Sequence, residues 1–227
     1  MTQSIPFLLP QLLLCPLLYK HAIEWGSFVG KPIPIPLSTA IYFALGIGFY
    51  LLLPNALPVN ELVAVGVLVS LLISLSIIDA HTQYIPNIFP MGIAVMGFGV
   101  NVAEQGPFTH PCESFIAGVA SYGLLAGANL LYKRMKGVDG IGMGDAKLFA
   151  ALGFWFGWAG MLPILIISNA LFIAVSLVRG FWGKGDAPLA FGPYLAVAGG
   201  VMVWSAISSC TAIRFLILEP LLLAQCF

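Results

Sequence analysis

The chain has 227 residues, of which 60% are hydrophobic and 8% charged, and nine basic residues balance nine acidic ones. Soluble domains carry roughly a quarter of charged residues, so the composition excludes an ordinary soluble domain and indicates a protein that lies mostly in lipid. A net charge of zero, without a basic patch that includes aromatic residues, gives no support to nucleic-acid binding. We therefore expect an all-α, polytopic integral membrane protein whose main surroundings are the lipid bilayer.

Apolar runs recur along the sequence, and about 20 apolar residues are needed to cross roughly 30 Å of hydrocarbon. They predict about eight transmembrane helices within a single membrane domain, residues 1–227, without an internal repeat. The expected spans are residues 5–19, 36–53, 61–78, 87–103, 114–132, 145–160, 161–178 and 189–209. The first span contains two prolines and the tail after residue 210 carries two charges, so either segment could instead lie at the membrane interface.

The N-terminal apolar segment has no basic region before it and no small-residue cleavage site, so we expect a retained span rather than a removed signal peptide. Alternating the eight spans gathers most of the basic residues on one side of the membrane. These residues are Lys20, Lys31, Lys133, Arg134, Lys136, Arg179 and Lys184, with Lys147 just inside the following helix. Because basic loops stay cytoplasmic, this side is predicted to be cytoplasmic and both termini to lie outside.

The cysteines and histidines predict no metal site. The four cysteines, which form no CxxC pair, are Cys15, Cys112, Cys210 and Cys226. Without paired ligands no zinc ribbon is predicted, and the three histidines are too dispersed to add one. Cys112 and Cys210 fall on the predicted outer side, where a disulfide is permitted but not required.

Two aspartates share one predicted membrane depth. Asp79 ends the third span and Asp145 begins the sixth, both on the cytoplasmic side. A carboxylate in hydrocarbon costs roughly 2.5–3.5 kcal/mol at a helix centre, so each aspartate is either functional or a helix-end residue wetted by headgroups. Two neighbouring carboxyls cannot easily both ionise, so one serves as an acid and the other as a base. Such a pair can activate water to hydrolyse a peptide bond.

Local position suggests which aspartate is the anion and what surrounds it. Asp145 opens a helix and Asp79 closes one, so the helix dipoles favour the anion at Asp145. Gly142 and Gly144 let the backbone take conformations forbidden to other residues and let another chain approach closely, although a plain loop is the alternative reading. Lys147 either pairs with a carboxylate and so influences the site, or is only a further basic residue that indicates the cytoplasmic side.

For three other polar residues the sequence favours a structural or solvent-exposed role over a catalytic one. Asp139, near three basic residues, and Asp186 are expected to be solvated loop aspartates, and His81 a structural histidine.

The segments IDAHTQYIPN, GMGDAKLFAALGFWFGW and LAFGPYLAVAGG, in this order, resemble the type IV prepilin peptidases, the bacterial branch of the GxGD aspartic proteases. The resemblance runs from about residue 63 to residue 200, inside an expected core of residues 60–205. On this resemblance Asp79 and Asp145 match the two catalytic aspartates, and site-shaping residues match at Gly142, Gly144, Lys147 and Pro86. Further matches lie at Ile85, Phe191, Gly192 and Pro193.

The resemblance implies an aspartic endopeptidase of the bacterial cytoplasmic (inner) membrane with its active site facing the cytoplasm. Its expected substrates are prepilins or type II secretion pseudopilins, cut between a short basic leader and the apolar helix. Proteolysis of this kind needs no cofactor. Many members also carry a loop with two CxxC pairs after the first span and methylate the new pilin N-terminus with S-adenosylmethionine. Here residues 1–35 hold only the first span and a shortened loop without cysteine, so zinc is not expected and methylation stays open.

Two other classes of function fit the same residues. Intramembrane carboxylates also bind cations or relay protons, so an ion-coupled transporter is the main alternative. A non-catalytic scaffold of pilus assembly is the other.

Overall fold

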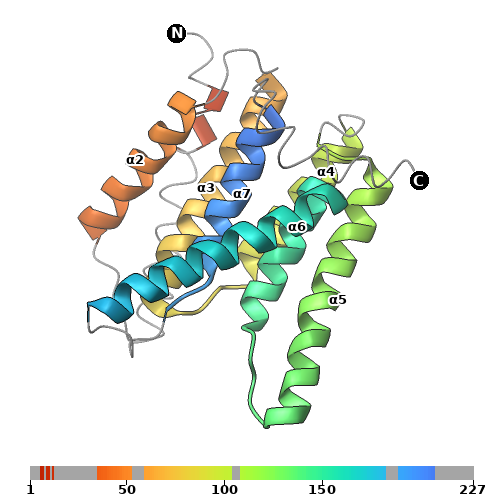
Figure 1. Ribbon diagram of the computed structural model, residues 1–227. Helices are drawn as coiled ribbons and strands as arrows, with labels where there is room; N and C mark the ends of the chain where they lie inside the picture. The colour runs from red at the N-terminus through yellow and green to blue at the C-terminus, as the bar shows by residue number, and fades with distance from the viewer. Residues whose placement is uncertain are drawn as a thin grey trace.

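The computed structural model describes residues 35–52, 59–103, 108–182 and 189–207, together with Pro6, Phe7, Leu9, Pro10 and Leu12. Over these residues the regular structure is entirely helical, in agreement with the expected all-α class. The helices are α2 (Ile35–Leu52), α3 (Val59–Thr82), α4 (Ile88–Ala103), α5 (Pro111–Lys136), α6 (Met143–Phe181) and α7 (Gly192–Ile207). Figure 1 shows them as one bundle, with α3 and α7 side by side and α5 at the edge opposite α2.

Among the described helices, α3, α5 and α6 are long and apolar enough to cross a membrane, and α2, α4 and α7 are shorter apolar helices. The expected spans 36–53, 61–78, 87–103, 114–132 and 189–209 each fall on one helix. Most of the expected span 5–19 lies outside the described residues. The number of about eight spans therefore stays a prediction.

The expected spans 145–160 and 161–178 form one element, the 39-residue α6, which bends sharply. The bend lies at Gly157, where φ is 61° and ψ is −158°, rather than between residues 160 and 161. Figure 1 shows the first arm of α6 rising beside α5 and the second arm crossing back over the bundle. A side chain at residue 157 would collide with Thr109, and L-residues rarely adopt a positive φ, so only glycine suits this position.

The bend breaks the hydrogen-bond ladder of α6, and side chains of α4 and α5 take over the freed carbonyls. The amide of the buried Asn101 donates to the carbonyl oxygens of Phe154 and Trp155, at 3.1 Å each. Ser114 donates to the same Phe154 carbonyl. In hydrocarbon an unpaired carbonyl costs several kcal/mol, so these side chains make the bend tolerable within an apolar bundle.

The apolar core lies where α3, α4, α6 and α7 meet. Its largest fully buried member is Trp155, whose indole N–H donates to the carbonyl oxygen of Ile93 at 2.7 Å. The indole fills the space left by Gly97, because a side chain on Gly97 would collide with it. The close packing of the indole on Gly97 and its hydrogen bond to Ile93 fix α4 against the first arm of α6.

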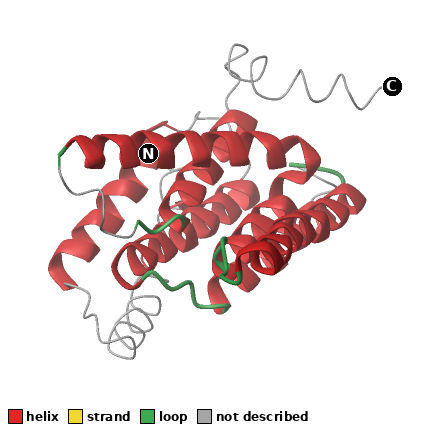
Figure 2. Ribbon diagram, turned by 60° about the horizontal axis from the view of Figure 1, so that its bottom comes forward, coloured by secondary structure: helices red, strands yellow, loops and turns green. Residues whose placement is uncertain are grey.

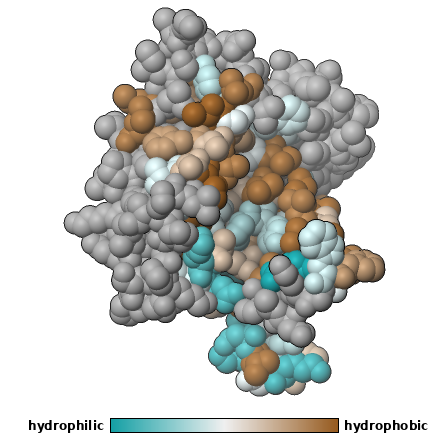
Figure 3. All heavy atoms as spheres, turned by 90° about the vertical axis from the view of Figure 1, so that its left-hand side faces the viewer, coloured by the Kyte–Doolittle hydropathy of each residue, from teal (hydrophilic) through white to brown (hydrophobic). Residues whose placement is uncertain are grey.

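One end of the bundle gathers several helix termini, at the bottom of Figure 1 and turned forward in Figure 2. There α3 and α5 end, α6 begins after a short loop, and α7 begins. The basic residues Lys133, Arg134 and Lys136 lie in the last turn of α5. Figure 3, which views the molecule from the side of α2, shows mostly apolar residues above and hydrophilic ones gathered toward this lower end. The fold thus has one distinctly polar end.

We predict that Gly157→Ala destabilises the fold, because alanine is strained at this positive φ and its Cβ would collide with Thr109. The expected loss is about 1–3 kcal/mol in the free energy of unfolding, measured by denaturant titration in detergent micelles. Gly123→Ala is the matched control, since a Cβ at Gly123 meets no atom within 4 Å. Equal stability of the two variants would contradict the role assigned to the bend.

Candidate active site

Asp79 lies in the last turn of α3 and is buried, with 4% of its surface exposed. The backbone N–H of Gly192 donates to its Oδ2 at 2.9 Å. Gly192 is the first residue of α7, whose N-terminus therefore faces this carboxyl group. Both the hydrogen bond and the positive end of the α7 dipole stabilise the carboxylate form. The local structure thus holds Asp79 in a fixed position at the polar end of the bundle.

Asp145 lies in the first turn of α6 and is half-buried. Its side chain reaches back toward the helix start, since a Cβ built on Gly142 would lie 2.7 Å from its Oδ2. Gly142 is the N-cap with φ −63° and ψ 128°, a conformation open to any residue. The prediction that Gly142 adopts a backbone conformation forbidden to other residues is therefore wrong. What glycine supplies here is room for the Asp145 carboxyl group, which a side chain at residue 142 would displace.

Ile85 connects the surroundings of the two aspartates. A Cβ on Gly144 would lie 2.8 Å from Cβ of Ile85, and a Cβ on Gly192 would lie 3.1 Å from its Cδ1. The buried Ile85 side chain thus packs directly on both glycine backbones. Gly144 directly precedes Asp145 in the chain, and Gly192 is hydrogen-bonded to Asp79. The structure therefore brings together the two aspartates that the sequence singled out.

The segment between α3 and α4 supplies further contacts. Pro86 is buried next to Ile85 in the chain, and its site-shaping role stays a prediction. The ammonium of Lys147 donates to Oδ1 of Asn87 at 2.7 Å and so ties α6 to this segment. Lys147 is thereby a cross-link between parts of the site rather than only a marker of topology. Asn87 was missed by the sequence analysis, although it directly follows the matched Ile-Pro pair.

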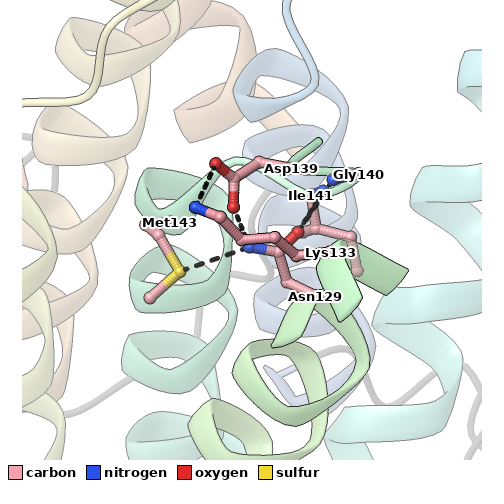
Figure 4. Close-up of polar contacts among 6 residues, drawn as sticks. All are labelled: Asn129, Lys133, Asp139, Gly140, Ile141 and Met143. Atoms are coloured by element: carbon pink, nitrogen blue, oxygen red, sulfur yellow. Dashed lines mark hydrogen bonds and ion pairs between the residues drawn. The ribbon is translucent and has the colours of Figure 1, made fainter. Parts of the chain in front are cut away.

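The turn that leads from α5 into α6 is held by polar side chains, drawn in Figure 4. Oδ1 of Asn129 accepts from the backbone N–H groups of Gly140 and Ile141, at 2.8 and 2.9 Å. Its Nδ2 donates to Oδ1 of Asp139 at 3.0 Å, and Lys133 pairs with Oδ2 at 2.9 Å. Asp139 is exposed, as expected of a loop aspartate, but it is also bonded to α5. The sequence analysis missed Asn129. The one sign of its role in the sequence is that it is a polar residue within an apolar span.

The remaining candidates do not join this cluster by any described contact. His81 is exposed near the end of α3, and Phe191 packs edge-on against Phe172 in the second arm of α6. Asp186 and Cys210 lie outside the described residues, so the Cys112–Cys210 disulfide stays a prediction. Over the described ranges, no three His, Cys, Asp or Glu side chains lie together as metal ligands would.

Fold and site together define a helical membrane protein with two acidic groups at one polar end. Residues 65–178, about half of the chain and including both aspartates, match the model of the type IV leader peptidase family. The chain belongs to this family.

Three relatives named "Prepilin leader peptidase/N-methyltransferase" illustrate the similarity. The protein of Neisseria gonorrhoeae is 38% identical over 149 residues, which cover 63% of this chain and 50% of the relative. That of Burkholderia pseudomallei is 34% identical over 135 residues, covering 59% and 43%. That of Pseudomonas aeruginosa is 32% identical over 148 residues, covering 63% and 50%. The chain thus spans about half the length of these relatives, and no solved structure matches it significantly.

The contacts of Asp139 give a prediction for its titration. The hydrogen bond from Lys133, followed by that from Asn129, holds the pKa of the Asp139 carboxyl below its usual range. Its contribution to stability is therefore fully present above the unfolded value, about 3.9, and is lost as pH falls through the lower folded value.

We expect Lys133→Gln to raise the pKa of Asp139 toward the usual range, measured by carboxyl NMR titration. Lys136→Gln, on the same exposed end of α5, is the control and should leave this pKa in place. An equal rise in both variants would show that general positive charge, not the Lys133 contact, causes the effect.

Proposed function

We propose that the chain is an aspartic endopeptidase that removes the short basic leader from type IV prepilins or type II secretion pseudopilins. The observation that carries the proposal is the pair of carboxyl groups, Asp79 and Asp145, linked through Ile85 at the polar end of the bundle. Membership of the type IV leader peptidase family supports the substrate class. The basic end of the bundle would face the cytoplasm of a bacterial inner membrane, where a prepilin leader is found.

In the proposed reaction Asp79 is the base and Asp145 the acid. The N–H of Gly192 favours the anion at Asp79, and a hydrogen bond to a charged group contributes about 1.5–3 kcal/mol, more than the roughly 0.3–1 kcal/mol of a helix dipole. This reverses the assignment made from helix ends alone. Asp79 takes a proton from water while the water oxygen attacks the peptide carbonyl. Asp145 donates its proton to the amide nitrogen as the C–N bond breaks, which releases the leader as a carboxylic acid and a new N-terminal amine. The new carboxylic acid loses its proton to solvent, and transfer of the proton from Asp79 to Asp145 restores the starting pair.

An apolar groove beside Asp79 would hold the part of the substrate that stays in the membrane. It has a volume of 580 Å³ and lies between α2, α3 and α7. Its lining includes Phe49, Val69, Leu72, Ile73, Val197 and Trp204. Its walls also include Ser76, one turn before Asp79, and Pro193, next to Gly192. A prepilin cut just before its apolar helix would place that helix in this groove and its scissile bond near Asp79.

Methylation of the mature pilin with S-adenosylmethionine is not part of this proposal. The three relatives carry "N-methyltransferase" in their names, but the chain spans about half of their length. The mass of the mature pilin distinguishes the outcomes, because leader loss and an added methyl group give different masses.

We predict that Asp79→Asn and Asp145→Asn each lower cleavage at least about a thousandfold, because each removes one partner of the acid–base pair. Each variant is expressed with a prepilin, and the pilin is weighed by mass spectrometry. Glu113→Gln is the matched control, since Glu113 lies at the opposite end of α5. Normal maturation by either asparagine variant would overturn the proposal. Ion-coupled flux that is lost in the same variants would favour the transporter instead.

We predict that Val197→Phe raises the KM for a full-length prepilin about tenfold with a smaller change in kcat, because the ring fills the groove. Val197 is 53% exposed and lines the groove. Val95→Phe is the matched control, since Val95 is 71% exposed on α4. An unchanged KM in Val197→Phe would indicate that the groove holds lipid rather than substrate.

A further inference from the structure

The turn at residues 137–142 has little means of holding its own shape. It contains glycine at 137, 140 and 142, and Gly137 ends α5 with φ 77°. Glycine loses more backbone freedom on ordering than any other residue, so a turn this rich in glycine needs bonds from outside to keep one conformation. The turn leads directly into the start of α6, which carries Gly144 and Asp145. Any movement of the turn would therefore move the start of α6.

We propose that Asn129 is a positioning residue that fixes this turn and thereby aims Asp145 at its partner Asp79. The inference rests on the proposed function, since it assigns Asn129 a role in the reaction that these two aspartates would perform. Asn129 lies on α5, about two turns before that helix ends, and touches neither aspartate by a described contact. Its effect on Asp145 passes through the backbone of the turn.

Both the oxygen and the nitrogen of the Asn129 side-chain amide form hydrogen bonds. Its oxygen accepts from the N–H groups of Gly140 and Ile141, and its nitrogen donates to Asp139 and contacts Sδ of Met143 at 3.9 Å. The contacts thus reach both the middle of the turn and the first residue of α6, as Figure 4 shows. Asn129 is 4% exposed, so water cannot easily replace these bonds.

Lys133 and Asp139 support Asn129 but contribute less. Lys133 lies one helical turn after Asn129, on the same face of α5, and its ammonium orients Asp139 toward the Asn129 amide. The side chains of Lys133 and Asp139 are 53% and 55% exposed, and an exposed ion pair contributes little. Loss of the Asn129 amide should therefore be severe, whereas loss of the ion pair should be mild.

The first measurement is amide hydrogen exchange of the full-length chain in lipid nanodiscs. Asn129→Ala should speed exchange at Gly140 and Ile141 at least about tenfold, because their acceptor is removed. Asn169→Ala is the matched control, since the described hydrogen bond of Asn169 goes to the carbonyl of Leu165, one turn earlier in α6, and its loss should leave these amides protected. Unchanged protection in Asn129→Ala would overturn the proposal. This measurement does not depend on any cleavage activity.

The second measurement separates positioning from a general loss of stability. Asn129→Asp keeps an oxygen for the two N–H groups but sets a second carboxylate against Asp139, so kcat for prepilin cleavage should fall at least about tenfold at neutral pH. In the double variant Asn129→Asp/Asp139→Asn, the carboxylate lies at residue 129 and the amide at residue 139, so an amide–carboxylate pair is restored. Its kcat should recover to within about threefold of that of the unsubstituted chain. Asp139→Asn alone should change kcat less than about threefold.

The pH profile and KM distinguish the two kinds of role. In Asn129→Asp, acidification protonates one of the facing carboxyls, so kcat relative to that of the unsubstituted chain at the same pH should recover partly as pH falls, while KM stays unchanged. A merely structural role would reduce the folded fraction but leave kcat per folded molecule and its pH profile unaltered, and that result would overturn the proposal. If the unsubstituted chain cleaves no prepilin, the proposed function fails, while the exchange measurement still decides whether Asn129 holds the turn.

Discussion

The close packing of Ile85 on two glycine backbones is the contact on which the site depends. Gly144 belongs to α6, Gly192 to α7, and Ile85 to the segment between α3 and α4. Three parts of the chain meet at the Ile85 side chain, and the two aspartates lie at the edges of this contact. A larger residue at either glycine would push a helix end away from Ile85 and separate the acidic groups. Close approach, not backbone freedom, is therefore what glycine supplies here.

Polar side chains inside an apolar bundle hold the rest of the architecture in place. Asn101 binds the carbonyls freed where α6 bends, and Asn129 binds N–H groups in the turn before the same helix. Each amide therefore acts on one end of the first arm of α6, the arm that carries Asp145. In surroundings that offer little water, such bonds have few competitors and specify one conformation. The arm is thus fixed at its start and at its bend.

The position of the site suits the proposed cleavage of a peptide bond by a membrane helix bundle. The aspartates lie at the polar end of the bundle, where α5 also ends in a basic turn, and the apolar groove lies between α2, α3 and α7, with Ser76 and Pro193 in its walls. Under the proposed function, a substrate that is hydrophilic before its cleaved bond and apolar after it fits this arrangement. The membrane itself would then set the depth at which the bond is presented.

The sequence by itself determined the helical class, the approximate helix bounds, the two aspartates and the family. Apolar runs and a carboxylate in lipid are local signals, and they remain visible whatever the helices pack against. Tertiary structure decided the bend at Gly157, the cross-link from Lys147 to Asn87, and the roles of Asn101 and Asn129. These depend on which backbone groups packing leaves unpaired and which side chains it brings near. Asn101 and Trp155, for example, are 54 positions apart, and no local pattern links them.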